Sequence, residues 1–279
     1  MNKTLYISDL DGTLLNSSSL VSETSRHMLN HLIEEQGILF SIATARTPAT
    51  VARLMEGIAC KLPLIVMTGA AMWTPAGLTN THFLKTKDVK TILHLTSKAG
   101  IQPFFYTLNG TRIEAWHHPE VNDYDRDFMM QRCHTVHKRF ILSPELDEQR
   151  MKLTMLVFAA ADYDLMGNVF QQVKTQTDCS ITYYRDIFNN NIGFLEAMGN
   201  GVSKAKAVAQ LKEQCKAERV VVFGDSPNDL SMRTVADVFV APENASPEVL
   251  RVADEVTLTN NDDCVAHWIN NDVKRQSKR

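Results

Sequence analysis

The first part of the chain alternates unbroken apolar runs with apolar positions spaced as on one face of a helix. The runs predict strands buried on both faces, and the helical spacing predicts amphipathic helices between them. Gly37 stands where a helix ends, and Thr47 followed by Pro48 is typical of a helix start. The expected elements are strands at 4–8, 38–43 and 64–67, and helices around 28–33 and from 48 onward. This order predicts a parallel sheet covered by helices on both faces.

The same pattern returns near the end of the chain. Ser203 precedes a helical apolar pattern, and Ser246-Pro247 predicts a second helix start. Apolar runs at 219–223 and 255–258 predict further buried strands. We therefore expect both ends of the chain to build one doubly wound α/β core, formed by residues 1–81 and 193–279.

The segment 82–192 has a different texture. Strand-like runs flank Asn109-Gly110, the pair typical of a tight β-hairpin. The other expected elements are helices at 88–98 and 163–175 and strands at 152–159 and 180–185. The segment is predicted to be an inserted α/β domain with a mostly antiparallel sheet.

Charge and cysteine usage narrow the classes of partner. The 279 residues carry 29 Lys and Arg against 32 Asp and Glu, so the formal net charge is −3. Charges of both signs are spread along the chain, which disfavours a nucleic-acid partner, and the basic end 274–279 is expected to be a solvated tail. No apolar segment has the length of a signal peptide or membrane span, so no membrane partner is expected. Five scattered cysteines without a C-x-x-C pair indicate reduced thiols in a cytoplasmic protein.

Asp9 and Asp11 stand at the carboxyl end of the first expected strand, where open parallel sheets bind their ligands. A spacing of two points both side chains the same way on extended backbone, and Gly12 permits a sharp turn after them. A capped turn with two solvated acids is the alternative. A chance occurrence of Asp-x-Asp-Gly-Thr is rare, which favours a chemical role.

Four motifs in order resemble those of the haloacid dehalogenase superfamily of phosphotransferases. The motifs are Asp9–Thr13, Ile42–Arg46 with its hydroxyl residue Thr44, Gly201–Lys204, and Gly224–Asp229. The long insert, together with Gly-Val-Ser-Lys and Gly-Asp-x-x-Asn-Asp, resembles the Cof-type branch (subfamily IIB) with its large α/β cap. The resemblance covers essentially the whole chain and implies that 82–192 is a cap that sets substrate specificity.

The residues of these motifs fit phosphoryl transfer. A phosphomonoester dianion repels a carboxylate nucleophile, so Asp9 needs a counter-charge, and Mg²⁺ is a hard cation that carboxylate oxygens bind. Asp9 and Asp225 offer such oxygens at two strand ends. Asp229 and Asn228 would hold the coordination shell of the metal from the next helical turn. Helix capping is an equal alternative for Asn228 and Asp229.

The resemblance implies the remaining roles. Asp11 would supply a backbone carbonyl to the metal and act as general acid and then general base. Thr44 would bind a phosphoryl oxygen, together with Ala45, Arg46 and Asn228, and Lys204 would neutralise developing charge. Taken alone, Thr44 and Lys204 would be a strand residue and a surface helix lysine, and the order of the motifs favours the catalytic roles.

The chain departs from many Cof-type relatives at three positions. It has Ala45 and Cys264 where they have Gly, and Thr68-Gly69 where they have Asn-Gly. Ala45 and Thr68 lie on loops that, in relatives, approach the substrate phosphate, so Thr68 can lower or redirect activity. None of the departures touches the nucleophile, the acid, the lysine or the metal aspartates.

The sequence as a whole predicts Mg²⁺-dependent hydrolysis of a small phosphate ester, with sugar phosphates implied by the resemblance, through an aspartyl-phosphate on Asp9. The alternatives are a sugar phosphomutase of the same superfamily and a non-catalytic phosphometabolite-binding protein. The sequence indicates no oligomeric state.

Three weaker signals have ordinary explanations. His117-His118 and His134-x-x-His137 are more typical of solvated histidines than of zinc ligands. Arg185 and 189–191 fit a polar connecting loop better than a sugar contact. Asn244 in Asn-Ala-Ser-Pro is either a neighbour of the metal site or part of a helix cap.

Overall fold

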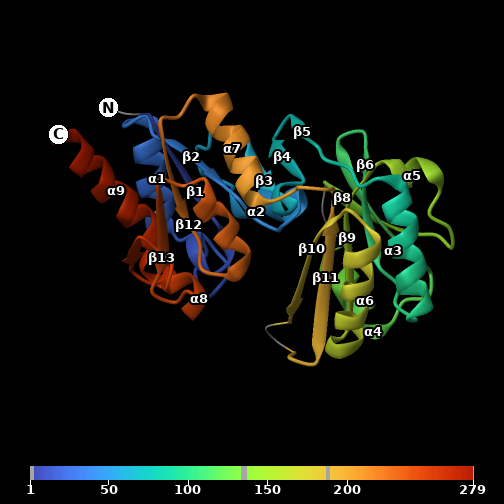
Figure 1. Ribbon diagram of the computed structural model, residues 1–279. Helices are drawn as coiled ribbons and strands as arrows, with labels where there is room; N and C mark the ends of the chain where they lie inside the picture. The colour runs from blue at the N-terminus through green and yellow to red at the C-terminus, as the bar shows by residue number, and fades with distance from the viewer. Residues whose placement is uncertain (1–2, 133–136, 187–188, 279) are drawn as a thin grey trace. The chain divides into compact units, whose positions relative to one another are not determined.

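Strands from both ends of the chain form one parallel sheet. The structure is a computed structural model that describes residues 3–132, 137–186 and 189–278. Within these residues the sheet has the order β14-β13-β12-β1-β2 (Figure 1). Its strands are β1 (Thr4–Ser8), β2 (Leu39–Ile42), β12 (Arg219–Phe223), β13 (Val238–Pro242) and β14 (Glu255–Thr257). Because β1 pairs in parallel with both β2 and β12, the carboxyl ends of these three strands meet at one edge.

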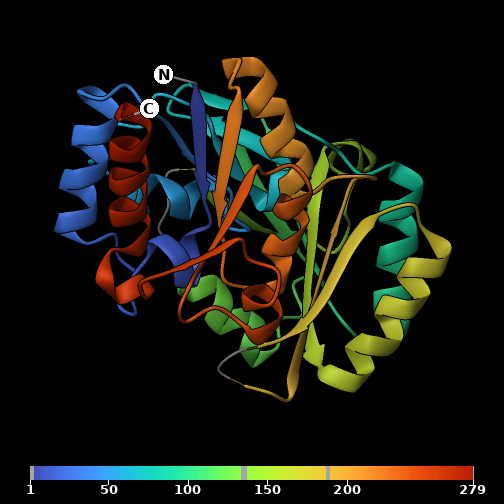
Figure 2. The same cartoon turned by 60° about the vertical axis from the view of Figure 1, so that its left-hand side comes forward.

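Helices cover both faces of this sheet. Helix α7 (Lys204–Cys215) packs on the face that contains Val222. On the other face, Trp268 of α9 (Cys264–Ser277) packs edge-on against Phe223, with ring centroids 5.4 Å apart. Figure 2 shows α1 (Glu23–Glu34) beside α9. The shorter elements of this unit are η1 (Leu10–Leu14), α2 (Pro48–Leu54), η2 (Met67–Gly69), η3 (Pro227–Thr234), α8 (Pro247–Leu250) and η4 (Asn260–Asp262).

The third predicted strand departs from the parallel sheet. β3 (Leu64–Val66) touches it through one bridge, between Ala43 and Ile65, and pairs antiparallel with β4 (Ala71–Thr74), which pairs with β5 (Gly77–Thr79). The antiparallel pairing with β4 follows from the segment 67–69, where three successive residues have φ of 52°, 57° and 93°. This left-handed run turns the chain back on itself.

The expected basic tail is also corrected. Residues 274–277 continue α9 instead of forming a solvated tail. Gln276 Nε2 donates hydrogen bonds to Asp272 Oδ2 at 2.7 Å and to the Tyr6 hydroxyl at 3.1 Å. These bonds tie the last helical turn to the first strand, an interaction that local charge does not reveal.

A second sheet lies in the middle of the chain. In the described residues it has the order β10-β11-β9-β6-β7-β8, with only the β7–β8 pair parallel. The strands are β6 (Phe104–Asn109), β7 (Arg112–His117), β8 (Lys138–Leu142), β9 (Thr154–Asp162), β10 (Ser180–Arg185) and β11 (Ile192–Met198). The Asn109-Gly110 hairpin is present as predicted, with Gly110 at φ 60°.

The chain divides into two compact units, residues 1–79 with 203–279 and residues 80–202. The sequence-based limits were 81/82 and 192/193. The second limit falls inside β11, which pairs along its length with β9 and β10. The return to the first unit therefore comes after the Gly199–Gly201 turn.

Helices also cover the second sheet. Trp116 and Phe105 lie in an apolar cluster with residues of α3 (Thr86–Lys98) and α6 (Tyr163–Gln176). On the other face, Phe128 of α4 stacks on Phe158 with centroids 5.1 Å apart. The remaining helices of this unit are α4 (Asp123–Met130) and α5 (Glu148–Lys152).

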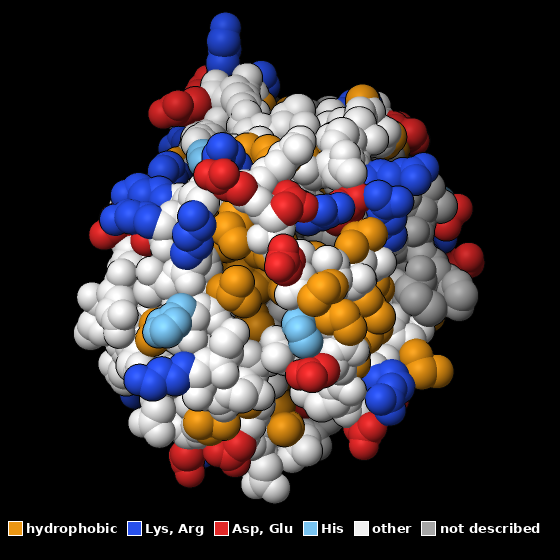
Figure 3. Space-filling model, turned by 90° about the vertical axis from the view of Figure 1, so that its right-hand side faces the viewer, with side chains coloured by type: hydrophobic (Ala, Val, Ile, Leu, Met, Phe, Trp, Pro, Cys, Tyr) orange, Lys and Arg blue, Asp and Glu red, His pale blue; other side chains and the backbone are white. Residues whose placement is uncertain are grey.

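The charges on the surface are mixed, as the sequence predicts. On the face drawn in Figure 3, side chains of both charges are interspersed. Among the described residues, no helix combines the length and apolarity needed to cross a bilayer. Cys60, Cys179, Cys215 and Cys264 are free thiols, whereas Cys133 and His134 lie outside the described residues.

Candidate active site

Asp9 is the first residue after β1 and is almost fully buried, with 6% of its surface exposed. Its backbone N–H donates to Phe223 O at 2.9 Å, which fixes the ends of β1 and β12 side by side. This bond extends the parallel ladder by one residue. Asp9 is therefore placed by the sheet itself and not by a flexible loop.

Lys204 begins α7 and is completely buried. Ser203 caps the helix by accepting a hydrogen bond from the N–H of Lys206 at 3.2 Å. The Lys204 ammonium donates to Asp9 Oδ1 at 2.5 Å and to Asp229 Oδ1 at 2.7 Å. One buried cation thus links two sequence motifs that lie far apart in the chain.

Asp225 and Asp229 complete a carboxylate cluster with Asp9. One oxygen from each of the three lies within 4.8 Å of the others, the one such group of metal-ligand atoms found among the described residues. The Thr13 hydroxyl donates to Asp225 Oδ1 at 2.9 Å. Three of the four predicted metal aspartates are therefore brought together.

Asp229 caps η3, which is one of the two roles that the sequence left open, and it also contacts Lys204 in the carboxylate cluster. Its Oδ2 accepts hydrogen bonds from the backbone N–H groups of Asp225 and Ser226, each at 3.1 Å, in a capping box at the start of η3. Its other oxygen accepts from Lys204. Because both oxygens have protein donors, Asp229 mainly orients the cluster.

The carboxylates of the cluster outnumber its one ammonium group, and the pKa values of its members are shifted. Burial, with the neighbouring Asp229 carboxylate, raises the pKa of Asp9 well above its usual value. The same causes raise the pKa of Asp225 to about 6. Burial lowers the pKa of Lys204, but the Asp229 and Asp9 carboxylates outweigh it and raise that pKa overall. Three carboxylates facing one ammonium form an oxygen donor set that suits a hard divalent cation such as Mg²⁺.

Gly12 allows Asp225 to approach the first motif. It has φ 74°, and a Cβ at this position would lie 2.5 Å from Asp225 Oδ2. The Asn244 side chain donates to Gly12 O at 2.8 Å, and its own oxygen accepts from the N–H of Asn260. Asn244 therefore stabilises the turn that contains Gly12, and both of its side-chain hydrogen bonds are to backbone groups.

Asp11 lies outside the carboxylate cluster and pairs with Arg46. Arg46 Nε donates to Asp11 Oδ2 at 2.7 Å and Nη2 donates to Oδ1 at 2.6 Å. This bidentate pair raises the pKa of Arg46. The sequence did not predict it, because the two residues come from separate loops and no spacing rule relates them.

Thr44 contacts Arg46, the residue that pairs with Asp11. Thr44 is buried, and its hydroxyl accepts a hydrogen bond from the N–H of Arg46 at 3.1 Å. The N–H of Thr68 donates to Thr44 O at 2.9 Å. Thr68 holds φ 57°, a strained value for a β-branched residue. Position 69 requires glycine, because a Cβ there would lie 2.4 Å from Ser203 O at the start of α7.

Other predicted residues are not drawn into this network. Ala45 offers only a methyl side chain, and the exposed Asn228 accepts a hydrogen bond from the Ser226 hydroxyl at 2.8 Å. His117 is fully buried, 3.5 Å from Asp125, so the expectation that it is solvated was wrong. It lies on the strand face covered by α4, where its ring packs on an aromatic neighbour.

Arg185 is the last residue of β10, and its side chain contacts the connecting loop that follows. It donates to Asn190 O at 2.5 Å, and its guanidinium lies 3.4 Å from the centre of the Tyr163 ring. These contacts hold the turn between β10 and β11.

Comparison with known proteins identifies the chain's relatives. A family model described as haloacid dehalogenase-like hydrolase matches residues 6–269. The chain belongs to this family. The resemblance predicted from the four motifs is thereby confirmed, and the matched region runs from β1 to α9.

Individual relatives of this haloacid dehalogenase-like hydrolase match it end to end. The 5-amino-6-(5-phospho-D-ribitylamino)uracil phosphatase YcsE of Bacillus subtilis is 27% identical over 268 residues, 94% of each chain. A solved haloacid dehalogenase-like hydrolase from Bacteroides thetaiotaomicron has a TM-score of 0.77 at 23% identity and covers 97% of this chain and 99% of that one. The structure of the HAD subclass IIB sugar phosphatase BT4131 has a TM-score of 0.74 at 19% identity, with coverages of 96% and 98%. The predicted α/β fold is confirmed.

Proposed function

We propose that this hydrolase is a Mg²⁺-dependent phosphatase that hydrolyses small phosphate esters through an aspartyl-phosphate on Asp9. The observation that carries the proposal is the environment of the Asp9 carboxylate. Its Oδ1 is held by Lys204, whereas no described residue donates a recorded hydrogen bond to Oδ2. One oxygen is thus fixed and the other is left to act as a nucleophile.

Asp9 and Asp225 would hold the Mg²⁺, with Asp229 orienting the cluster and the Asp11 carbonyl completing the protein's share. Bound there, the cation would offset the repulsion between a phosphate dianion and the carboxylates. The raised pKa values of Asp9 and Asp225 support this assignment, because burial and the neighbouring Asp229 carboxylate both disfavour their charged forms, which a bound cation would stabilise.

In the first step, Asp9 Oδ2 attacks phosphorus and forms an acyl-phosphate bond. The bond between phosphorus and the ester oxygen breaks, and its electron pair leaves with that oxygen. Asp11 donates the proton that converts the leaving alkoxide into an alcohol. Lys204 stays on Asp9 Oδ1 and opposes the charge that grows as the bond forms.

In the second step, water attacks the phosphorus of the aspartyl-phosphate. Asp11 takes a proton from that water, and the bond between Asp9 and phosphorus breaks to release inorganic phosphate and the free carboxylate. Asp11 returns to its protonated form, ready for the next ester. Atoms and protons therefore balance over the cycle.

Arg46 would change partners during this cycle. While it donates both hydrogen bonds to Asp11, that carboxylate acts only as an acceptor. A substrate phosphate is the natural alternative partner for a guanidinium, because phosphate oxygens also match its fork. Substrate binding would thus free Asp11 for proton transfer, with the Thr44 hydroxyl beside the same phosphate.

The substrate class follows from the relatives' names. One relative dephosphorylates a phosphoribityl compound by name, and one fold neighbour is named a sugar phosphatase. Both names describe a phosphate on a polyhydroxylated carbon chain. We extend this class to the present enzyme and assign the choice of ester to the second unit, residues 80–202.

The test is phosphate release from a panel that includes ribose 5-phosphate, glucose 6-phosphate, ribitol 5-phosphate and AMP, each with Mg²⁺ and with EDTA. Release that requires Mg²⁺ and favours the sugar and polyol phosphates is expected. The Asp9→Asn variant should keep its fold by circular dichroism and lose turnover. A bisphosphate-primed isomerisation without net phosphate release would overturn hydrolysis in favour of a mutase, and binding without either reaction would leave only a binding protein.

A further inference from the structure

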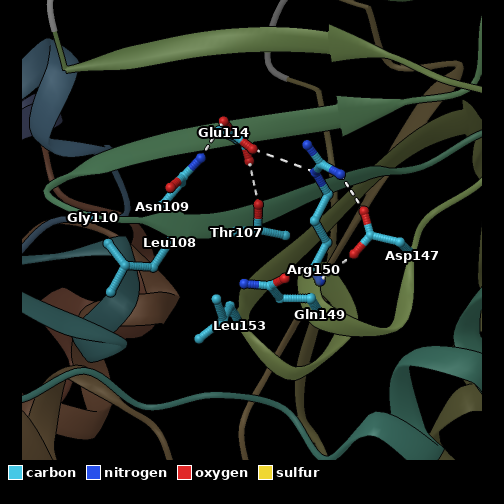
Figure 4. Close-up of a pocket in the computed structure, with 9 residues that line it drawn as sticks. All are labelled: Thr107, Leu108, Asn109, Gly110, Glu114, Asp147, Gln149, Arg150 and Leu153. Atoms are coloured by element: carbon cyan, nitrogen blue, oxygen red, sulfur yellow. Dashed lines mark hydrogen bonds and ion pairs between the residues drawn. The ribbon is translucent and has the colours of Figure 1, made fainter.

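A polar pocket lies in the second unit, apart in sequence from all four motifs. Its volume is about 270 Å³. The tip of the β6–β7 hairpin forms one side, and α5 with the residue that follows it forms the other (Figure 4). We call it the Glu114 pocket; its polar lining residues are Thr107, Asn109, Glu114, Asp147, Gln149 and Arg150.

Glu114 is the buried anchor of this pocket, with 2% of its side chain exposed. Asn109 Nδ2 donates to its Oε1 at 2.7 Å, and Arg139 Nε donates to the same oxygen at 3.0 Å. Burial raises the pKa of Glu114, but these bonds outweigh it and hold that pKa below its usual value. A carboxylate this deeply buried stays charged only because it is paired.

Arg150 joins Glu114 to the second acid of the wall. Its Nη1 is paired with Asp147 Oδ2, and its backbone N–H donates to Asp147 Oδ1 at 2.9 Å. Its Nε is buried and faces Glu114 Oε2 at 3.4 Å, without a hydrogen bond to any described residue. Two carboxylates thus face two guanidinium groups, those of Arg139 and Arg150, and the wall has no net charge.

Once these pairs are formed, neutral hydrogen-bonding groups remain to meet a ligand. The Gln149 side chain is exposed, and no bond from its amide to another described residue is recorded. Asn109 uses its NH₂ group on Glu114 and keeps its oxygen as an acceptor, and the Thr107 hydroxyl donates to Glu114 O at 3.2 Å and keeps its lone pairs. Figure 4 shows Asn109 and Gln149 on opposite sides of the space. The pocket therefore offers donors and acceptors together, with Leu108 and Leu153 as its apolar contacts.

This set of groups selects among ligand classes. A phosphate or other strong anion would find no uncompensated positive charge here, because both guanidinium groups are already paired. A purely apolar ligand would leave the amides unpaired. Hydroxyl groups donate and accept equally well, and the volume equals that of about nine liquid waters, room for a pentitol or a hexose.

We propose that the Glu114 pocket binds a small neutral polyhydroxy compound, a sugar or sugar alcohol without a phosphate group. Such a ligand would bridge Gln149 on α5 and Asn109 on the hairpin, so that it links two elements that the Glu114 ion pairs already join. A ligand of this size that makes a few neutral hydrogen bonds has a dissociation constant on the order of 1 mM. The site needs neither Mg²⁺ nor turnover, so it stands independently of the proposed function.

The test is a titration of the ¹⁵N-labelled full chain with ribitol, followed by NMR of the backbone and side-chain amides without Mg²⁺. Shift changes at residues 107–110 and 149–153 and at the Gln149 side-chain amide are expected, with saturation in the millimolar range. Gln149→Leu should weaken ribitol binding at least tenfold. Gln171→Leu, an exposed substitution on α6, is the matched control and should bind as the wild type does.

Three outcomes would overturn the proposal. The first is no saturable shift change in the pocket, which would reduce Glu114, Arg139 and Arg150 to a structural ion-pair network. The second is unchanged ribitol binding in Gln149→Leu, since the ligand would then bind elsewhere, for instance at the carboxylate cluster. The third is binding of inorganic phosphate at these amides in preference to ribitol, which would make the pocket an anion site.

Discussion

Replacement of Lys204 by methionine tests the electrostatic argument for the site. Methionine keeps an unbranched apolar stem like that of lysine but removes the ammonium that donates to Asp9 at 2.5 Å and Asp229 at 2.7 Å. Lys204 and Asp229 are fully buried and Asp9 is nearly so, so water cannot take over either bond without opening the site.

The magnitude follows from the burial of all three groups. Removal of one partner from a buried ion pair costs about 3–5 kcal/mol because it leaves uncompensated charge. Without Mg²⁺, the free energy of unfolding of Lys204→Met should fall by that amount near neutral pH. Mg²⁺ supplies replacement positive charge, and at 100 times its dissociation constant it restores about 2.7 kcal/mol. The chemical step should stay slow, with kcat lowered about 10²–10³-fold, because a donor aimed at developing charge is lost.

Two assays follow these effects in the same samples. Urea unfolding with EDTA or with Mg²⁺ measures stability, and phosphate release from the best ester measures kcat. The control is Lys206→Met, at an exposed position two residues further along α7. It should alter the free energy of unfolding by less than about 0.5 kcal/mol. Two results would show that Lys204 does not compensate the negative charge of the cluster. One is a metal-free Lys204→Met variant as stable as the control, and the other is a kcat with Mg²⁺ within about threefold of the control.

Four further changes probe separate parts of the structure. Gly12→Ala places a Cβ 2.5 Å from Asp225 Oδ2, so the Mg²⁺ concentration for half-maximal phosphate release should rise at least tenfold; an unchanged metal dependence would contradict the assigned metal site. Thr68→Asn replaces a β-branched residue at φ 57° by one that tolerates this backbone. The free energy of unfolding measured with urea should therefore rise by about 1 kcal/mol, and a fall would refute the strain argument. Burial lowers the pKa of Lys138 from 10.5 to about 8, so the unfolded chain holds more protons between these values and the free energy of unfolding should rise with pH there. Lys138→Met should remove that rise, worth about 3 kcal/mol at most, and a persistent slope in pH-dependent unfolding would assign it elsewhere. Arg46→Met removes the guanidinium expected to bind phosphate, so KM should rise about 10–100-fold, whereas an unchanged KM would exclude that contact.

The sequence predicted the parts of the fold that local patterns specify. Strands β1 and β12, which precede Asp9 and Asp225, were predicted because both are short and largely apolar. The hairpin at Asn109-Gly110 was predicted because that pair favours the backbone its turn requires. Element order alone then indicated a core formed from both ends of the chain.

The missed features depend on contacts between distant segments. No strand was predicted at β11, and the domain limit was placed at its start, because its long pairing with β9 and β10 has no local sequence signal. The left-handed run at 67–69, which reverses the chain from β3 into β4, contains two non-glycine residues that do not signal such a turn. Helix α9 ends in basic residues that were interpreted as a tail, although Gln276 anchors it to Tyr6.

The site was predicted as a set of residues but not as a network. The motif order indicated which aspartates matter, but not that Lys204 bonds two of them or that Asp229 also caps η3. The pairing of Asp11 with Arg46 has no sequence signal, because it depends on how two loops fold at the sheet edge. Such pairings become visible only in three dimensions.

The most direct test of the central claim is to trap the covalent intermediate. The enzyme is mixed with its best phosphate ester and Mg²⁺, quenched in acid within the first turnover, digested, and analysed by mass spectrometry. We predict a phosphoryl group on the peptide that contains Asp9, formed as fast as the alcohol is released and absent in Asp9→Asn. Turnover with no phosphorylated peptide at any quench time, or turnover by Asp9→Asn, would contradict nucleophilic catalysis by Asp9.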